Sequence, residues 1–336
     1  MAVQKIIIDC DPGIDDALAL LFAHGHPDLE LCGITTVAGN VGLDLTTANA
    51  LRVRDYVGLD AVPVVAGSPR PLLRPVIDAR EVHGDSGLGA VSLPAPSSRA
   101  ADGHAADFLA RVIGAAPGEI TLIAVGPLTN IALTVRHYPQ IVTQVRDFVI
   151  MGGSAGRGNV TPAAEFNIAA DPEAAAIVFA AGWTVTMVGL DATLQAPATT
   201  AIRDRMRGLG RLADDLLLPS LSGYRSSSPV AVSTAGLDGQ AQRPAGPAVH
   251  DVCAVARVAA PDLITCMPAQ VRVETAGQWT SGMTVTDFAA PAADWNAQVA
   301  VAIDADGFWE LVLDAYQRVA AGLPVPQRDP GERAEA

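Results

Sequence analysis

The chain has 336 residues, of which 50% are apolar and 17% are charged, so it has enough apolar side chains for a large core and is not a generally disordered protein. Its formal net charge is −14 and Lys5 is its only lysine, which argues against a surface that binds nucleic-acid phosphates. The N-terminus enters a short apolar run with no signal-peptide pattern and no membrane-spanning stretch, so we expect a cytoplasmic protein without a membrane partner.

Short apolar runs typical of buried parallel strands recur along the chain. They lie at residues 6–9, 31–37, 62–66, 120–125, 148–151 and 185–190. Helical patterns separate several of these runs and lie at residues 15–23, 43–56 and 105–113. This alternation predicts an α/β fold, a doubly wound and mostly parallel central sheet with helices on both faces.

No linker rich in proline, glycine and serine divides the pattern, so we expect a single domain over residues 1–323. Residues 324–336 are rich in proline and charge, and we expect a disordered tail there. Residues 216–248 mix serine, glycine and proline around Tyr224, which predicts a loop-rich excursion that returns to a helix near His250. The cysteines are widely spaced, which favours reduced thiols over disulfides or a zinc site. They are Cys10, Cys32, Cys253 and Cys266.

Polar clusters follow the apolar runs directly. They lie at residues 9–11, 36–40, 126–130 and 152–153. In a doubly wound sheet the ligand site lies beyond the carboxyl ends of the strands, so these clusters predict one site at one rim of the sheet.

The densest cluster places four carboxylates in eight residues, between an apolar strand and an apolar-faced helix. They belong to Asp9, Asp11, Asp15 and Asp16. A helix N-terminus stabilises a carboxylate by less than about 1 kcal/mol, which is too little to offset like-charge repulsion in a partly buried crevice. Because the cluster offers only hard oxygen ligands, we expect calcium or magnesium rather than zinc. For any single aspartate, a helix cap or a turn is an equally good interpretation.

Two other segments carry weaker signals. His250 and Asp251 open a helical pattern, where a capping Asp251 beside an exposed histidine is the simpler interpretation. Glycines after Met151 allow close backbone approach to a ligand, and Asn159 with residues 165–167 offers donors and acceptors suited to sugar hydroxyls. An ordinary polar loop before a capped helix explains this last segment equally well.

Taken in order, these motifs resemble the inosine-uridine-preferring nucleoside hydrolases, which hydrolyse the bond between ribose and nucleobase. The resemblance covers most of the chain, and its first block, Asp-Cys-Asp-Pro-Gly-Ile-Asp-Asp, is the most specific. The matching blocks are residues 9–16, 35–40, 83–89, 126–130, 151–153, 165–167 and 250–251.

The resemblance implies a Ca²⁺ cofactor held by the carboxylates of Asp11, Asp16 and Asp251 and by the backbone carbonyl of Val125. With two ribose hydroxyls and one water, a bidentate Asp16 would complete about eight oxygen ligands, which suits calcium. The resemblance also implies that Asp11 is the general base that takes a proton from this water.

The resemblance further assigns residues to the ribose. Asp15 and Asn167 would hold ribose hydroxyls, Asn159 and Glu165 would reach toward the 5′-hydroxyl, and Asn40 would support the metal and the sugar.

On the base side, His250 is the candidate proton donor to the leaving base, a role worth about 10² to 10⁴ in rate. The other residues assigned to the substrate are Met151, His83, Phe166 and Tyr224. The segment between Tyr224 and His250 departs from the family's aromatic-rich flap, so the preferred base, whether purine, pyrimidine or nicotinate, stays open. The resemblance also implies a homodimer or homotetramer.

Two alternatives remain at this point. A phosphohydrolase of the haloacid-dehalogenase type also places an Asp-x-Asp pair after an early strand, but it usually needs a later lysine, and this chain has none after Lys5. A calcium-dependent nucleoside-binding or ribose-binding protein without turnover would use the same residues.

Overall fold

The computed structural model describes residues 3–223 and 246–324. The expected tail beyond residue 324 and most of the 216–248 segment, including Tyr224, lie outside the described residues. No helix of the described ranges is both long and apolar enough to cross a membrane.

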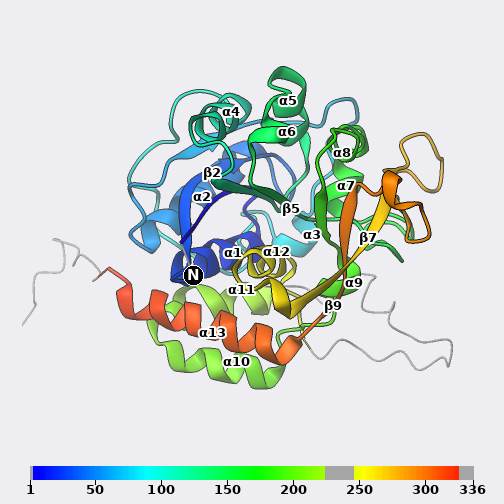
Figure 1. The fold of residues 1–336 in the computed structure, drawn as a ribbon. Coiled ribbons are helices and arrows are strands. Elements are labelled where there is room, and N and C mark those ends of the chain that lie inside the picture. Colours follow the sequence, from blue (N-terminus) through cyan, green and yellow to red (C-terminus); the bar gives the residue numbers. More distant parts are fainter. Residues whose placement is uncertain (1–2, 224–245, 325–336) are drawn as a thin grey trace, which may run out of the picture.

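A nine-stranded sheet forms the centre of the molecule (Figure 1). Its strands are β1 (Gln4–Cys10), β2 (Leu29–Thr36), β3 (Val64–Ala66), β4 (Ile120–Ala124), β5 (Asp147–Met151), β6 (Val185–Val188), β7 (Ile264–Val273), β8 (Thr284–Asp287) and β9 (Ala297–Ile303). Their order across the sheet is β3-β2-β1-β4-β5-β6-β9-β7-β8. Neighbours from β3 to β9 pair in parallel, and β7 pairs antiparallel with both β9 and β8. The predicted doubly wound, mostly parallel sheet is therefore confirmed.

Helices cover both faces of this sheet, and each face has its own apolar core. One face carries α1 (Ile14–Gly25), α2 (Leu43–Tyr56), α12 (His250–Ala259) and α13 (Ala305–Gly322). The other carries α4 (Ala105–Ala115), α5 (Thr129–His137), α6 (Ile141–Gln144) and α8 (Pro172–Phe179), above the sheet in Figure 1. Because successive side chains of a strand point to opposite faces, Ile6 and Ile8 enter the first core and Ile7 the second. This double burial explains why β1 is a continuous apolar run.

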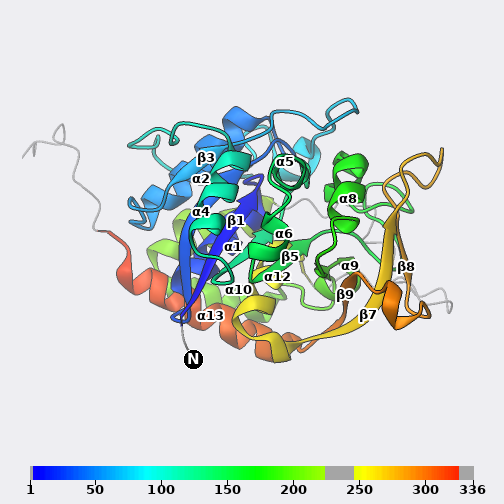
Figure 2. The same cartoon turned by 45° about the horizontal axis from the view of Figure 1, so that its top comes forward.

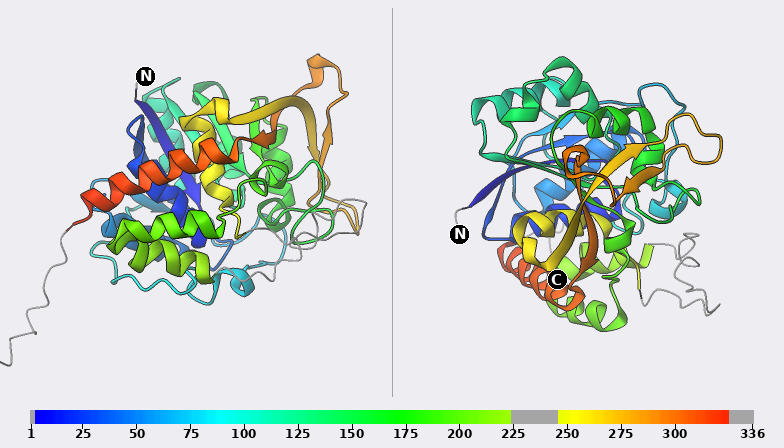
Figure 3. Two further views of the ribbon diagram at one scale, coloured as in Figure 1. Left: turned by 90° about the horizontal axis from the view of Figure 1, so that it is seen from below. Right: turned by 45° about the vertical axis from the view of Figure 1, so that its right-hand side comes forward.

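Short helices fill the connections and the outer layer. They are α3 (Arg80–His83), α7 (Phe166–Ala170), α9 (Leu190–Thr193), α10 (Thr200–Met206) and α11 (Leu218–Gly223). Helix α10 lies beside α13, as the left view of Figure 3 shows. The β7–β8 pair forms the edge of the sheet that lies opposite to β3, as Figure 2 shows.

Helix α1 is buried more completely than its sequence pattern predicts. The pattern places Leu18, Leu21 and Phe22 on one inner face, but the structure buries every residue from Ile14 to Ala23. The reason is that α12 packs beside α1 on the sheet and α13 packs on the outer side of α1, where Tyr316 Oη donates a hydrogen bond to Leu18 O at 3.1 Å. The helix is thus enclosed by the sheet, by α12 beside it and by α13 outside it.

The predicted strand over residues 185–190 ends early, at Val188. Leu190 N donates to Gly153 O at 3.0 Å, and a Cβ on Gly189 would lie 2.6 Å from that same oxygen. The chain turns there and opens α9, because only a glycine allows this close approach.

The order of the strands places the predicted rim site. Strands β1 and β4 are neighbours, while the chain moves from β1 toward β3 on one side and from β4 toward β6 on the other. Such a reversal opens a crevice beyond the carboxyl ends of the two central strands. Asp11 follows β1 and Val125 follows β4, so both lie at this crevice.

The described cysteines are all free thiols, as predicted. Cys10 and Cys253 are buried, and Cys32 and Cys266 are half-buried.

Candidate active site

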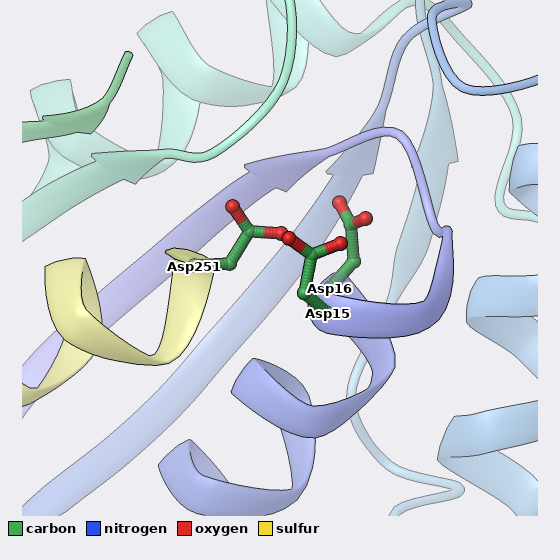
Figure 4. A group of neighbouring side chains, drawn as sticks. All are labelled: Asp15, Asp16 and Asp251. Carbon is green, nitrogen blue, oxygen red and sulfur yellow. The ribbon is translucent and has the colours of Figure 1, made fainter. Parts of the chain in front are cut away.

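Three carboxylates converge where the N-termini of α1 and α12 meet. Asp15 and Asp16 lie in the first turn of α1, and Asp251 is the second residue of α12. Each contributes an oxygen to a group in which all three atoms lie within 4.8 Å of one another, and all three residues are buried. Figure 4 shows Asp251 directed from the yellow helix toward the two aspartates of the blue helix. The fold therefore joins the two sequence motifs into one acidic cluster.

Asp11 lies directly beside this cluster and is braced by Asn40. Asp11 N donates to Asp16 Oδ1 at 3.0 Å, and Asn40 N donates to Asp11 Oδ2 at 2.7 Å. Asn40 Nδ2 also donates to Asp11 O and to Asp16 Oδ2, each at 3.1 Å. Asp11 Oδ1 is buried and has no hydrogen-bond partner within the described parts of the chain. One carboxylate oxygen is thus held firmly while the other stays available for a ligand.

These carboxyl groups are hard to ionise together in a buried site. Burial raises the pKa of Asp11 and of Asp251 well above the ordinary value, and the charges of neighbouring aspartates raise it further. Burial and the charge of Asp16 raise the pKa of Asp15 to about 8, and burial also raises the pKa of Asp16. A cation at the cluster would offset this penalty, because an opposite charge favours the ionised form.

Asn167, on α7, connects the carboxyl ends of β4 and β5. Its Nδ2 donates to Val125 O at 2.9 Å and to Met151 O at 3.0 Å. Because the amide donates through its nitrogen, its Oδ1 remains an acceptor. A carbonyl oxygen has two lone pairs, so Val125 O retains one for another partner.

Glu165 and Asn159 hold the loop that leads to α7. Glu165 caps this helix by accepting hydrogen bonds from Asn167 N at 2.9 Å and Ile168 N at 3.2 Å. Asn159 Oδ1 accepts from Phe166 N at 2.9 Å. Burial raises the pKa of Glu165 to about 7. Both predicted sugar-binding residues therefore also have a local structural role.

Two histidines border the carboxylates from different elements. His83 Nδ1 accepts a hydrogen bond from Ile14 N, at the start of α1, at 3.1 Å. His250 Nδ1 and Thr193 Oγ1 are 2.7 Å apart. Burial lowers the pKa of each imidazole to about 4, and the charge of His250 adds to the effect on His83. Both rings are therefore neutral near pH 7. His250 is buried rather than exposed, which overturns the simpler interpretation of its motif.

Sequence reasoning placed Asp9 in the acidic cluster without its hydrogen bonds to two other elements, and it missed Thr193. Asp9 Oδ1 accepts hydrogen bonds from Thr35 Oγ1 at 2.5 Å and from Asn130 Nδ2 at 2.8 Å, which ties β1 to β2 and to α5. Thr193 was missed because the polar clusters were sought only after the earlier strands. The available signal was its position in the short helix that follows β6 at the same rim.

The sequence profile described as "Inosine-uridine preferring nucleoside hydrolase" matches residues 6–310. The chain belongs to this family. It is 46% identical to the inosine-uridine preferring nucleoside hydrolase of Leishmania major, over 94% of this chain and 98% of that protein. It is 43% identical to the non-specific ribonucleoside hydrolase RihC of Salmonella newport, with the same coverage.

Solved nucleoside hydrolases share the fold of this chain. A purine-preferring ribonucleoside hydrolase from Gardnerella vaginalis superposes with a TM-score of 0.85 at 32% identity and covers 94% of this chain and 99% of its own. The plant nucleoside hydrolase PpNRh1 superposes with a TM-score of 0.81, also at 32% identity, over 94% and 99% of the two chains. The family resemblance seen in the motifs is thereby confirmed, and the haloacid-dehalogenase alternative is removed.

Close backbone packing around Asp11 leads to a first prediction for this nucleoside hydrolase. A Cβ on Gly39 would lie 2.1 Å from Asp11 Oδ2 and 2.8 Å from Pro127 Cδ, so Gly39→Ala must displace the carboxylate. A displacement of about 1 Å at a catalytic group costs about 10²-fold in rate. With Asp11 in the catalytic role that the family resemblance implies, we expect a loss of kcat of that order. Gly42→Ala is the matched control, because nothing lies within 4 Å of its Cβ, and its ribose release should match wild type. Equal activity of both variants would contradict the close packing.

Proposed function

We propose that this nucleoside hydrolase cleaves the N-glycosidic bond of ribonucleosides to give free base and ribose, with Ca²⁺ as its cofactor. The observation that carries the proposal is the buried convergence of three carboxylates beyond β1 and β4, with a fourth buried aspartate beside them. The three belong to Asp15, Asp16 and Asp251, and Asp11 donates a backbone hydrogen bond to Asp16. Relatives named for inosine, uridine or ribonucleosides in general support the substrate class.

The donor set fits a hard divalent cation. Asp11, Asp16, Asp251 and the carbonyl of Val125 would hold the ion, with oxygen atoms throughout, as calcium prefers. The unpartnered Oδ1 of buried Asp11 supports this assignment, since a buried carboxylate oxygen rarely lacks a partner. When bound, the cation would attract the sugar hydroxyls and the attacking water and make that water more acidic.

Asp11 is the proposed general base. It would take a proton from the attacking water, whose oxygen forms the new bond to the anomeric carbon of ribose. Asn40 keeps the carboxylate in place through its backbone N–H. Asp15 and the Oδ1 of Asn167 would hold ribose hydroxyls. The surrounding carboxylates favour the positive charge that develops on the sugar as the bond to the base breaks.

At the far end of the sugar, Asn159 and Glu165 would bind the 5′-hydroxyl with lone pairs that their backbone hydrogen bonds leave free. On the base side, the neutral ring of His250 would donate a hydrogen bond from its N–H to the leaving base, which then takes up its proton from solvent. His83, Met151 and Phe166 would border the base, and the proposed role of Tyr224 stays a prediction outside the described residues.

Metal removal tests the cofactor. Dialysis against a strong calcium chelator should reduce ribose release from inosine and uridine by at least about tenfold, and added CaCl₂ should restore it. A parallel sample with MgCl₂ separates calcium from the other hard cation. Full activity in chelator, with no calcium found by elemental analysis, would contradict the metal assignment.

A reducing-sugar assay separates the enzyme from a silent binding protein. We expect ribose release from ribonucleosides and a loss of rate with 2′-deoxynucleosides, because a hydroxyl that the cation and Asp15 would hold is missing. Heat of nucleoside binding in calorimetry without any ribose release would support the silent binder instead.

Assembly and location stay predictions for this chain. The expected homodimer or homotetramer is measured by size-exclusion chromatography with light scattering. The expected cytoplasmic location is measured by cell fractionation.

A further inference from the structure

Thr193 is fully buried and lies within hydrogen-bond distance of His250. Thr193 Oγ1 lies 2.7 Å from His250 Nδ1, and the exposed fraction of Thr193 is 0%. Helix α9, which ends at Thr193, begins directly after β6, where Gly189 leaves no room for a side chain beside Gly153. The hydroxyl is therefore set at the carboxyl rim of the sheet by the backbone itself.

The direction of the Thr193–His250 hydrogen bond follows from the partners that the hydroxyl has. Among the described residues, His250 Nδ1 is the hydrogen-bond partner found for Thr193 Oγ1. If Nδ1 carried the ring proton and donated it, the buried hydroxyl hydrogen would lack an acceptor, which is unfavourable. If the hydroxyl donates, Nδ1 is the acceptor and the single proton of a neutral imidazole lies on Nε2.

We infer that Thr193 is a positioning residue that holds His250 in the tautomer with its proton on Nε2. This inference rests on the proposed assistance of His250 to the leaving base, and it adds the group that determines which ring nitrogen donates. The other tautomer would present a bare nitrogen to the base, which gives the departing electron pair no hydrogen-bond donor. The Thr193 hydroxyl, far from the acidic motif in the sequence, thus keeps a proton on the His250 nitrogen that would donate to the leaving base.

Kinetics with two classes of substrate test the inference. Thr193→Val removes the hydroxyl and nearly preserves the shape of the side chain. We expect it to lower kcat for inosine and uridine by about tenfold or more with little change in KM, and to affect 4-nitrophenyl riboside much less, because that leaving group needs no donor. Thr193→Ser restores the hydroxyl and should recover most of the activity.

The control for this substitution is Thr134→Val. Thr134 is also fully buried, and its hydroxyl donates to Asn130 O at 2.8 Å within α5, so the variant loses a comparable hydrogen bond without touching His250. It should retain the wild-type ratio of activities on the two substrate classes. Equal losses on both classes in Thr193→Val, or no recovery in Thr193→Ser, would overturn the inference.

A spectroscopic measurement tests the pairing independently of turnover. In protein labelled with ¹⁵N-histidine, the His250 resonances, assigned with a His250→Gln sample, should show an unprotonated Nδ1 and a protonated Nε2. Thr193→Val should produce a mixture of tautomers. A wild-type His250 protonated at Nδ1 would overturn the inference. If wild-type protein shows the expected tautomer but releases no ribose from any nucleoside, the proposed function fails while the pairing stands.

Discussion

Asp11→Asn is expected to lower kcat for ribonucleosides by about 10³-fold while the fold survives. Asparagine has nearly the same shape as aspartate and keeps an oxygen that accepts the hydrogen bond from Asn40 N, so the rim should remain intact. The asparagine side chain lacks both the negative charge that attracts a cation and the basicity needed to take a proton from water. Ribose release measures the loss, and circular dichroism with a thermal melt measures the fold.

The matched control is Asp44→Asn. Asp44 also lies in the first turn of a helix, α2, but it is exposed to solvent, so the same substitution there should leave ribose release unchanged. Near-normal turnover by a correctly folded Asp11→Asn protein would remove Asp11 from the role of base.

The second large effect is expected from His250→Ala. With inosine or uridine as substrate we expect a loss of about 10²-fold, because the leaving base then departs without a hydrogen-bond donor. With 4-nitrophenyl riboside we expect a much smaller loss, since nitrophenolate is stable as an anion. Burial lowers the pKa of His250 to about 4, so near pH 7 its contribution comes from the one N–H of a neutral ring. Steady-state kinetics on both substrates measures the difference.

His137→Ala serves as the control for that substitution. His137 is exposed near the end of α5, so its removal should leave both activities at the wild-type level. Equal losses of His250→Ala on the two substrates would mean that the ring does not assist departure of the base.

Much of the fold was predictable because it depends on local patterns. Each predicted apolar run overlaps a strand from β1 to β6, since a strand buried on both faces needs apolar side chains at successive positions. The antiparallel edge formed by β7, β8 and β9, and the long helix α13, were not predicted. Strand β7 alternates between buried and exposed residues and contains Pro268, so its pattern is weaker than that of a central strand.

The sequence by itself determined the family, the parallel core and the acidic motif from Asp9 to Asp16, because each is a pattern of neighbours along the chain. Only the tertiary structure decided which distant groups meet at the rim. Asp251 completes the acidic cluster because α12 packs against α1. Thr193 contacts His250 across 57 residues of sequence because α9 packs against α12. Spacing in the sequence does not specify such contacts, since they depend on how the sheet and its helices pack in space.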